Sequence, residues 1–194
     1  MHYLAVGRID RSPRDLALAQ CRTIADGEII SFEQEWIFGA PLIARVDDAV
    51  RLEDLKAQVP AGCNAFVVEG LAEPGVGEAF VFGAHTMRDI GHFQSYADLV
   101  PDVVAKFGGR FLARASKVTP VAGDVIADRV VITEYPTAMD AVAFYVSDAY
   151  APLLKLRLAT VNARLVVLAR SGALPEAARK VAEGYLRSRR GSPR

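Results

Sequence analysis

The sequence is poor in cysteine. Only Cys21 and Cys63 occur among its 194 residues, and each lies among apolar neighbours. Two buried free thiols are the simplest interpretation, in preference to a disulfide or a redox pair, and they predict a reducing, cytoplasmic setting. The N-terminal segment MHYLAVGRIDRSPRD also has no basic stretch leading into an apolar one, so no signal peptide is expected.

The sequence also lacks an excess of charge of either sign. Its 23 basic and 23 acidic residues cancel, which leaves no strong field to attract nucleic acid or an anionic membrane surface. The longest largely apolar runs, such as VVITEY and RLVVLA, have the length of strands. They fall well short of the roughly 20 residues that a membrane-spanning helix needs. Neither nucleic acid nor a membrane is therefore an expected partner.

Motifs for metals and nucleotides are missing as well. The sequence has no H-x-x-x-H, no His–Cys cluster and no paired CxxC, so neither a zinc site nor an iron–sulfur site is expected. The Gly-Val-Gly at 75–77 does not join a strand to a helix, as a phosphate-binding loop does, and is interpreted as a linker. We predict no metal and no cofactor.

The second half of the chain has the clearest periodicity. Four strands are predicted, over 80–85, 110–115, 129–135 and 164–169, with TPVAGD (119–124) as a link. Two helices are predicted: one capped by Asp89 and kinked or divided by Pro101, and one from Ala138 to about Thr160 that restarts at Ser147. The resulting order β-α-β-β-α-β is the ferredoxin-like plan, an antiparallel sheet with both helices on one face. Its other, apolar face needs a cover.

The first half repeats this order more faintly. The predicted elements are a strand at 2–9, a helix from Ser12 to about Ala25, strands at 28–37 and 41–46, a helix at 51–59 and a strand at 64–70. Element order alone therefore suggests a duplication, in which one chain carries both sheets as an internal pseudo-dimer.

The expected organisation has three parts, separated by a linker rich in Gly and Pro, EPGVGE (73–78). Residues 1–72 form a degenerate ferredoxin-like unit and residues 79–170 a second such unit. Residues 171–194 form a C-terminal helix and a basic tail. The fold class is thus α+β, with two ferredoxin-like βαββαβ units whose antiparallel sheets pack as a dimeric α/β-barrel.

Three segments carry a resemblance to a known family: FGGRFLAR (107–114), TEYPTAMDAVAFYVSDAYAPLLKLR (133–157) and ARLVVLA (163–169). Their Gly-Gly-Arg step, Tyr-x-Ser-x-x-Tyr pattern and Leu-Arg pair resemble domain of unknown function 1330, of the dimeric α/β-barrel superfamily. Asp89-Ile90 stands where that family more often has Asp-Pro, and the first half of the chain does not match.

The resemblance implies two sheets packed face to face, with a pocket between sheet and helices. Relatives in the superfamily include cofactor-free monooxygenases, isomerases, cyclases and haem-degrading enzymes. The family itself has no agreed reaction, so the resemblance informs the fold more than the function.

Two residues are candidates for proton transfer. Glu134 shares a strand face with Val130 and Ile132, and an apolar wall there would suit it to this role. The alternative is a carboxylate paired with an arginine of the neighbouring strand. His85, at the end of the first strand of its unit, is the second candidate, because strand ends line a barrel mouth. A structural histidine is the alternative.

Five residues are candidates for substrate binding. Alternation along 110–115 places Arg110 and Arg114 on one face, about 7 Å apart, where they could clamp a carboxylate or a polarised carbonyl. Tyr145 and Tyr150 could donate hydroxyls to a ligand oxygen, and Arg157 could meet a carboxylate. Ion pairing, for the arginines, and packing, for the tyrosines, are the alternatives.

Two functions stay open at this point. The first is a cofactor-free enzyme of isomerase, cyclase or monooxygenase type, acting on a small carbonyl- or carboxylate-bearing molecule. The second is a non-catalytic ligand-binding or assembly module, and an amino-acid-sensing domain on the same plan is also compatible. A homodimer of whole chains stays open too. RNA binding is disfavoured, because the third strand of the unit reads Val-Val-Ile-Thr-Glu and lacks stacking aromatics.

Overall fold

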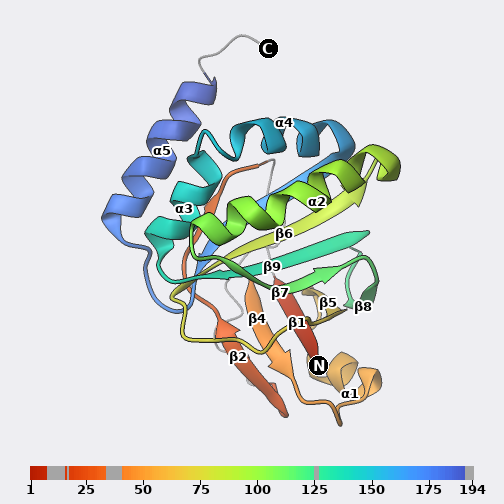
Figure 1. The fold of residues 1–194 in the computed structure, drawn as a ribbon. Coiled ribbons are helices and arrows are strands. Elements are labelled where there is room, and N and C mark those ends of the chain that lie inside the picture. The colour runs from red at the N-terminus through yellow and green to blue at the C-terminus, as the bar shows by residue number, and fades with distance from the viewer. Residues whose placement is uncertain (8–15, 17, 34–40, 125–126, 191–194) are drawn as a thin grey trace.

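The computed structural model describes residues 1–7, 16, 18–33, 41–124 and 127–190. Two five-stranded antiparallel sheets lie face to face, and helices cover their outer faces (Figure 1). We call them the N-sheet, with the order β2-β4-β1-β5-β8, and the C-sheet, with the order β3-β10-β6-β9-β7. The N-terminus lies at the end of the molecule that carries α1.

The C-terminal half forms the predicted βαββαβ unit. Its strands are β6 (Ala79–Met87), β7 (Arg110–Ala115), β9 (Arg129–Tyr135) and β10 (Val161–Ala169). Its helices are α2 (Ile90–Lys106), α3 (Ala138–Val146) and α4 (Ala151–Thr160). The strand order β10-β6-β9-β7 is that of a ferredoxin-like sheet.

Local sequence explains where these helices begin. Asp89 caps α2, as predicted, by accepting from the backbone N–H of His92 at 3.1 Å. Thr137 and Asp140 form a reciprocal capping box at the start of α3. Pro101 lies inside α2 without dividing it. The predicted break in the last helix is present, but the helix does not restart at Ser147. Ser147 is the C-cap of α3, its Oγ accepts from the backbone N–H of Tyr150 at 3.1 Å, and α4 begins after Tyr150, its N-cap.

The N-terminal half contains β1 (His2–Gly7), β2 (Cys21–Ala25), β4 (Leu42–Val46), α1 (Leu52–Gln58) and β5 (Asn64–Glu69). Its order β2-β4-β1-β5 matches β7-β9-β6-β10 of the other half. The predicted helix to Ala25 is wrong over Cys21–Ala25, since this segment pairs with β4 as an edge strand of the sheet. The earlier part of that predicted helix, residues 8–15 and 17, lies outside the described residues.

Each half also lends one strand to the other sheet. β3 (Ile29–Ser31) follows β2 but pairs with β10, and β8 (Val118–Ala122) follows β7 but pairs with β5. Of the predicted strand at 28–37, only Ile29–Ser31 is a strand, and residues 34–40 lie outside the described residues. The segment predicted as a link is largely β8. These exchanges join the two sheets at both edges.

The interior between the sheets is apolar. Tyr3, Ala5, Ile43, Phe66 and Val68 of the N-sheet pack in one cluster with Phe80, Phe82, Val130, Ile132, Val166 and Leu168 of the C-sheet. The Phe66 and Phe82 ring centroids lie 6.1 Å apart. The helix-free face of the C-sheet is therefore covered by the N-sheet, as its apolar composition required. The predicted fold class is confirmed.

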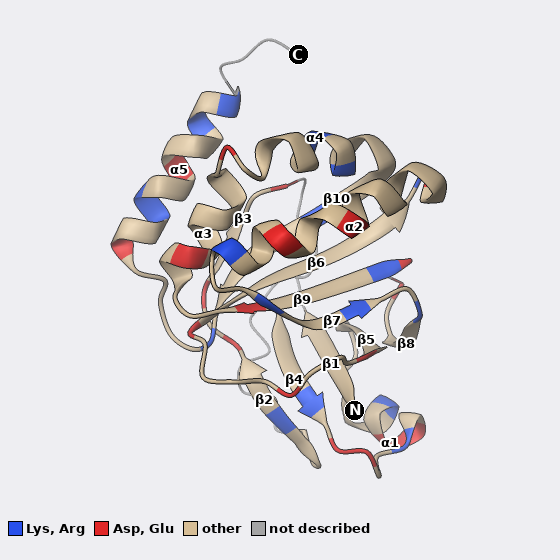
Figure 2. Ribbon diagram, viewed as in Figure 1, with Lys and Arg blue, Asp and Glu red and all other residues tan. Residues whose placement is uncertain are grey.

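Outer layers complete the molecule. α2, α3 and α4 cover the C-sheet, and α5 (Glu176–Arg190) packs on α3 (Figure 1). Acidic and basic residues alternate along α5 (Figure 2). Cys63 is buried and Cys21 half-buried, and both thiols are free. Among the described residues, every helix is too short or too polar to span a bilayer. The boundaries 1–72, 79–170 and 171–194 stay predictions.

Candidate functional site

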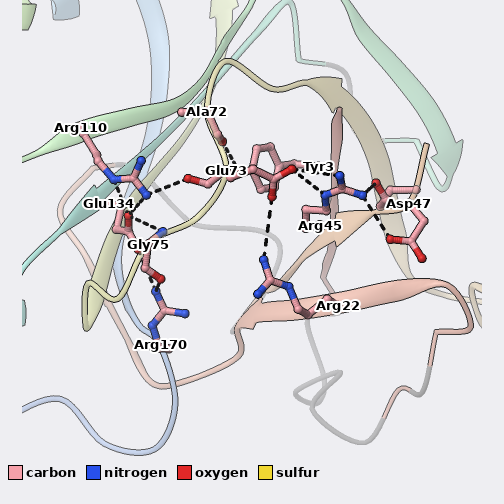
Figure 3. Close-up of polar contacts among 11 residues, drawn as sticks. Tyr3, Arg22, Arg45, Asp47, Ala72, Glu73, Gly75, Arg110, Glu134 and Arg170 are labelled. Atoms are coloured by element: carbon pink, nitrogen blue, oxygen red, sulfur yellow. Dashed lines mark hydrogen bonds and ion pairs between the residues drawn. The ribbon is translucent and has the colours of Figure 1, made fainter.

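The candidate residues lie in two separate places. Glu134 and Arg110 lie where β9, β7 and the 73–77 linker meet, which we call the barrel mouth (Figure 3). His85, Tyr150 and Arg157 line a small cavity between the C-sheet and its helices, which we call the inner cavity. The two places lie on opposite faces of the C-sheet, so they do not form one site.

At the barrel mouth, Glu134 is buried and fully engaged (Figure 3). Its Oε2 accepts from Arg110 Nε at 2.7 Å and from Gly75 N at 3.0 Å. Its Oε1 accepts from Arg170 Nη2 at 2.8 Å and from Gly77 N at 3.1 Å. The pairing with Arg110 that the sequence left open as an alternative is therefore present. Contacts of this kind fix a chain segment, whereas a general base needs a lone pair directed at its substrate.

The absence of side chains at Gly75 and Gly77 allows the linker backbone to come this close to Glu134. A Cβ on Gly77 would lie 2.4 Å from the Tyr135 carbonyl oxygen and 2.6 Å from Glu134 Cγ. A Cβ on Gly75 would lie 2.8 Å from Arg110 Nη2. Gly-Val-Gly thus presents two backbone N–H groups to a carboxylate of the protein itself. An open groove of about 360 Å³ adjoins it, lined by Val76, Arg110 and Pro136 among others.

The linker is also tied to the N-sheet (Figure 3). Tyr3 on β1 donates its hydroxyl to the Ala72 carbonyl oxygen at 2.6 Å. Arg45 on β4 bonds the Glu73 carboxylate at 2.9 Å, and Arg110 donates to the Glu73 carbonyl oxygen at 2.8 Å. Burial, reinforced by the charge of Glu73, raises the pKa of Tyr3 to about 12, so this hydroxyl remains a donor at neutral pH. The barrel mouth therefore joins the two halves.

Arg114 does not accompany Arg110. The expectation that both lie on one face is wrong, because the register of β7 against β9 shifts between Phe111 and Ala113. In such a bulge two successive residues oppose one partner, which reverses the alternation beyond it. Arg114 instead donates to the Ala97 carbonyl oxygen of α2 at 2.6 Å, with its guanidinium 4.7 Å from the Phe111 ring centroid.

The inner cavity lies between β6, β9 and β10 on one side and α2, α3 and α4 on the other. Aliphatic and aromatic side chains form most of its wall, including Val81, Phe111, Phe144 and Leu165. The space within which the centre of a water molecule could lie is about 20 Å³. This is room for about one water molecule. A larger ligand would have to widen it.

Arg157 on α4 is the charged group of this cavity. Its side chain is completely buried, with an ion pair from Nη2 to Glu33. Its Nε and Nη1 have no hydrogen-bond partner among the described residues. The guanidinium carbon lies 5.8 Å from the Tyr150 ring centroid and 6.0 Å from that of Tyr96. Burial lowers the pKa of Arg157 to about 9, which leaves it charged at neutral pH.

Three tyrosines surround Arg157. The hydroxyls of Tyr96 and Tyr150 lie 3.3 Å apart. Burial raises the pKa of Tyr96 to about 12 and that of Tyr150 well above its usual value, so both are neutral donors. Tyr145 donates to Glu33 Oε1 at 2.5 Å and therefore reaches the Arg157 site through that carboxylate.

His85 lies on the cavity wall as a neutral imidazole. It is 2% exposed, and its Nδ1 has no hydrogen-bond partner among the described residues. Desolvation, with a further contribution from the charge of Arg129, lowers the pKa of His85 to about 4. General bases work best with a pKa near the working pH. At neutral pH this imidazole is thus better suited to hydrogen bonding than to taking a proton.

Two residues beside Arg157 escaped sequence reasoning: Tyr96, which lines the inner cavity, and Glu33, which pairs with Arg157. Tyr96 lies with Phe93, Ala97 and Val100 on the buried face of α2, a spacing that could have identified it. Glu33 comes from the N-terminal half, where no motif and no family resemblance points to it. Among the described residues, no three acidic, histidine or cysteine side chains are close enough together to hold a metal ion.

The arrangement defines a class of protein: an α/β-barrel formed by two ferredoxin-like sheets within one chain. Residues 78–170 match the family model described as Domain of unknown function (DUF1330), so the resemblance predicted for the C-terminal half is confirmed.

One similar solved structure is a protein of unknown function from Rhodopseudomonas palustris, determined as a structural genomics target. The similarity covers 49% of this chain and 83% of that chain, with 21% sequence identity and a TM-score of 0.43. No curated protein matches the chain.

Proposed function

We propose that this protein binds a small carbonyl- or carboxylate-bearing molecule in the inner cavity. The observation that supports this is Arg157, which is wholly buried on the cavity wall with two N–H-bearing nitrogens, Nε and Nη1, lacking partners among the described residues. A buried polar group without a partner costs about 1–3 kcal/mol. A ligand oxygen that accepts from these groups removes that cost, and this is the source of affinity.

The other cavity residues have complementary roles in the proposal. His85, with its unpartnered Nδ1, hydrogen-bonds a second polar atom of the ligand, and Tyr150 offers its hydroxyl. Phe111 and Phe144 contact an apolar body. Because the cavity has room for about one water molecule, binding has to widen it. Phe111 is the wall residue best able to move, since it is half-buried on the edge strand β7.

Catalysis by the same groups would be cofactor-free and of isomerase, cyclase or monooxygenase type. Arg157 would polarise a carbonyl oxygen of the substrate, and neutral His85 would hydrogen-bond a second polar atom of it. Glu134 takes no part in catalysis in the inner cavity, because its contacts hold it at the barrel mouth. Binding without turnover is the alternative, and an assay of proton exchange α to the carbonyl of a bound ketone separates the two.

The test uses Arg157→Lys. A lysine keeps a positive charge beside Glu33. It has a single nitrogen, however, and so lacks counterparts of Nε and Nη1, the two nitrogens that Arg157 leaves unpaired. Pyruvate, benzoate and benzamide are screened by thermal shift, since a ligand bound only by the folded form raises the melting temperature. We expect at least one probe to stabilise the wild type and none to stabilise Arg157→Lys. Arg187→Met on the exposed face of α5 is the control and should respond like the wild type.

A second role, assembly, is supported at the barrel mouth by the bonds of Arg110, Glu134 and Arg170 to the linker. In this role the polar residues hold the two halves in register, and Glu134→Gln lowers stability without changing ligand binding in the inner cavity. If Glu134→Gln instead lost ligand binding while its stability stayed unchanged, the assembly role would be contradicted.

A tandem duplication is also part of the proposal. Both halves have the same strand order, and each sends the strand after its second strand into the other sheet, beside that sheet's fourth strand. A reducing, cytoplasmic setting, with Cys21 and Cys63 as free thiols, fits the same proposal.

A further inference from the structure

A carboxylate from the N-terminal half lies beside the proposed ligand site. β3 runs along β10, and the backbone N–H of Phe32 donates to the Leu165 carbonyl oxygen at 3.1 Å. The Phe32 ring stacks on Tyr145, with centroids 4.1 Å apart. The next residue, Glu33, is therefore fixed against the helix layer, and its side chain is only 2% exposed.

Glu33 neutralises Arg157. Its Oε1 makes the ion pair with Arg157 and accepts from the Tyr145 hydroxyl at 2.5 Å. Its Oε2 is buried with no hydrogen-bond partner among the described residues. The site therefore has unpaired hydrogen-bond donors on Arg157, while the charges of Arg157 and Glu33 sum to zero.

This charge balance discriminates between ligands. A carboxylate bound at Arg157 would bring a second negative charge next to Glu33, and two buried carboxylates that share a site disfavour each other's ionised form. An uncharged carbonyl oxygen accepts from the same guanidinium without adding charge. Shape does not separate these ligands, because an amide and the matching carboxylate have nearly the same size.

Building on the proposed function, we infer that Glu33 is a specificity-determining residue that selects an uncharged carbonyl compound, such as a ketone, lactone or amide, over a carboxylate of the same shape. This selectivity requires both halves of the chain. The N-terminal half, which lies outside the segment matching the family model, supplies this charge to a cavity formed by the C-terminal half.

The experiment compares benzamide with benzoate, which differ in charge but hardly in shape, by calorimetry at constant ionic strength. We expect the wild type to bind benzamide about tenfold more tightly than benzoate, or better, a difference that corresponds to about 1.4 kcal/mol. Glu33→Gln keeps a group that can accept from Tyr145 and removes the charge. We expect it to reverse the preference. Glu176→Gln on the exposed start of α5 should leave the ratio unchanged.

A second measurement covers the case in which Glu33→Gln is weakly folded because Arg157 has lost its partner. Benzoate should then restore the missing negative charge, so it should raise the melting temperature of Glu33→Gln more than benzamide does. In the wild type the order should be the opposite. Rescue of this kind would not follow from a purely structural ion pair.

The outcomes separate the two proposals. Equal affinity of the wild type for both probes, or the same ratio in Glu33→Gln, would overturn the role of Glu33 while ligand loss in Arg157→Lys still supports the proposed function. Absence of binding by benzamide, benzoate and pyruvate in wild type and variant alike would contradict the proposed function, and the selectivity would fall with it.

Discussion

His85 has a buried imidazole on β6 that can be charged only at the expense of folding. Its pKa is about 4 in the folded protein, against an ordinary value of 6.5. The unfolded chain therefore binds more protons than the folded one between these values, so the free energy of unfolding falls as the pH drops from about 6.5 to about 4. The shift corresponds to roughly 3 kcal/mol.

His85→Gln tests this dependence. Glutamine stays neutral, so chemical denaturation between pH 7 and pH 4 should show a smaller loss of stability in the variant than in the wild type. Carboxylates titrate in the same range in both proteins and cancel in the comparison. Parallel curves for the two proteins would mean that the imidazole is hydrated or paired in solution.

Gly77 is the backbone position at which the barrel mouth tolerates no side chain. In Gly77→Ala the new Cβ would meet the Tyr135 carbonyl oxygen at 2.4 Å, a contact that the backbone has to relieve by moving. Overpacking of this kind costs about 1–3 kcal/mol. Gly184→Ala is the matched control, since a Cβ there meets nothing within 4 Å inside α5. Urea unfolding should show a loss for the first and a small gain for the second.

At the scale of single residues, the sequence predicted one site, with His85 at the barrel mouth, whereas the structure has two separate places. His85 lies with Tyr150 and Arg157 in the inner cavity, and Glu134 pairs with Arg110 at the barrel mouth. Strand alternation could not reveal the bulge that separates Arg114 from Arg110, because a bulge depends on the pairing partner. The contact of Glu33 with Arg157 joins residues more than a hundred positions apart, and no local pattern encodes such a contact.

Among the elements, β3 shows how far local pattern can mislead. Ile29–Ser31 has the composition of a strand, and the sequence predicted one there, within the N-terminal unit. Its actual partner is β10 of the other sheet. Since the pleat has a period of two whichever strand lies alongside, hydrophobic pattern predicts that a strand exists but not where it pairs. For β8 even the existence of the strand was missed, because Pro120 and the following Gly123 suggested a turn.

The ring of Phe32 holds β3 against the helix layer, and truncating this side chain tests its contribution. Phe32→Ala should lower the free energy of unfolding by about 3 kcal/mol, because a buried aromatic ring and its stacking on Tyr145 are lost. The backbone N–H of Ala169, which donates to the Glu28 carbonyl oxygen at 2.9 Å, should then exchange with solvent faster. Leu99→Ala on the exposed side of α2 is the control and should change little. Unchanged exchange at Ala169 would mean that β3 is held without Phe32.

For the whole molecule, stability depends on apolar sheet faces that neither half can leave in water. Phe80, Phe82 and Ile132 are each fully buried against the N-sheet. A fragment of residues 78–194 would expose them, together with the open edge of β10 where β3 now pairs. Exposed apolar surface of that kind drives association.

We expect this fragment to form a homodimer in which β8 of each copy occupies the edge of β10 in the other. The whole chain already pairs β8 with β5, the fourth strand of the N-terminal half, and β10 is the fourth strand of the C-terminal half. Light scattering coupled to size-exclusion chromatography should give twice the fragment mass. Co-expression with residues 1–74 should replace the homodimer with a one-to-one complex, because the natural partner supplies a better-fitting face. Phe82→Asp in the fragment should abolish both assemblies. A well-folded monomeric fragment would show that the C-terminal half buries its apolar face without a partner, and the requirement for two sheets would be wrong.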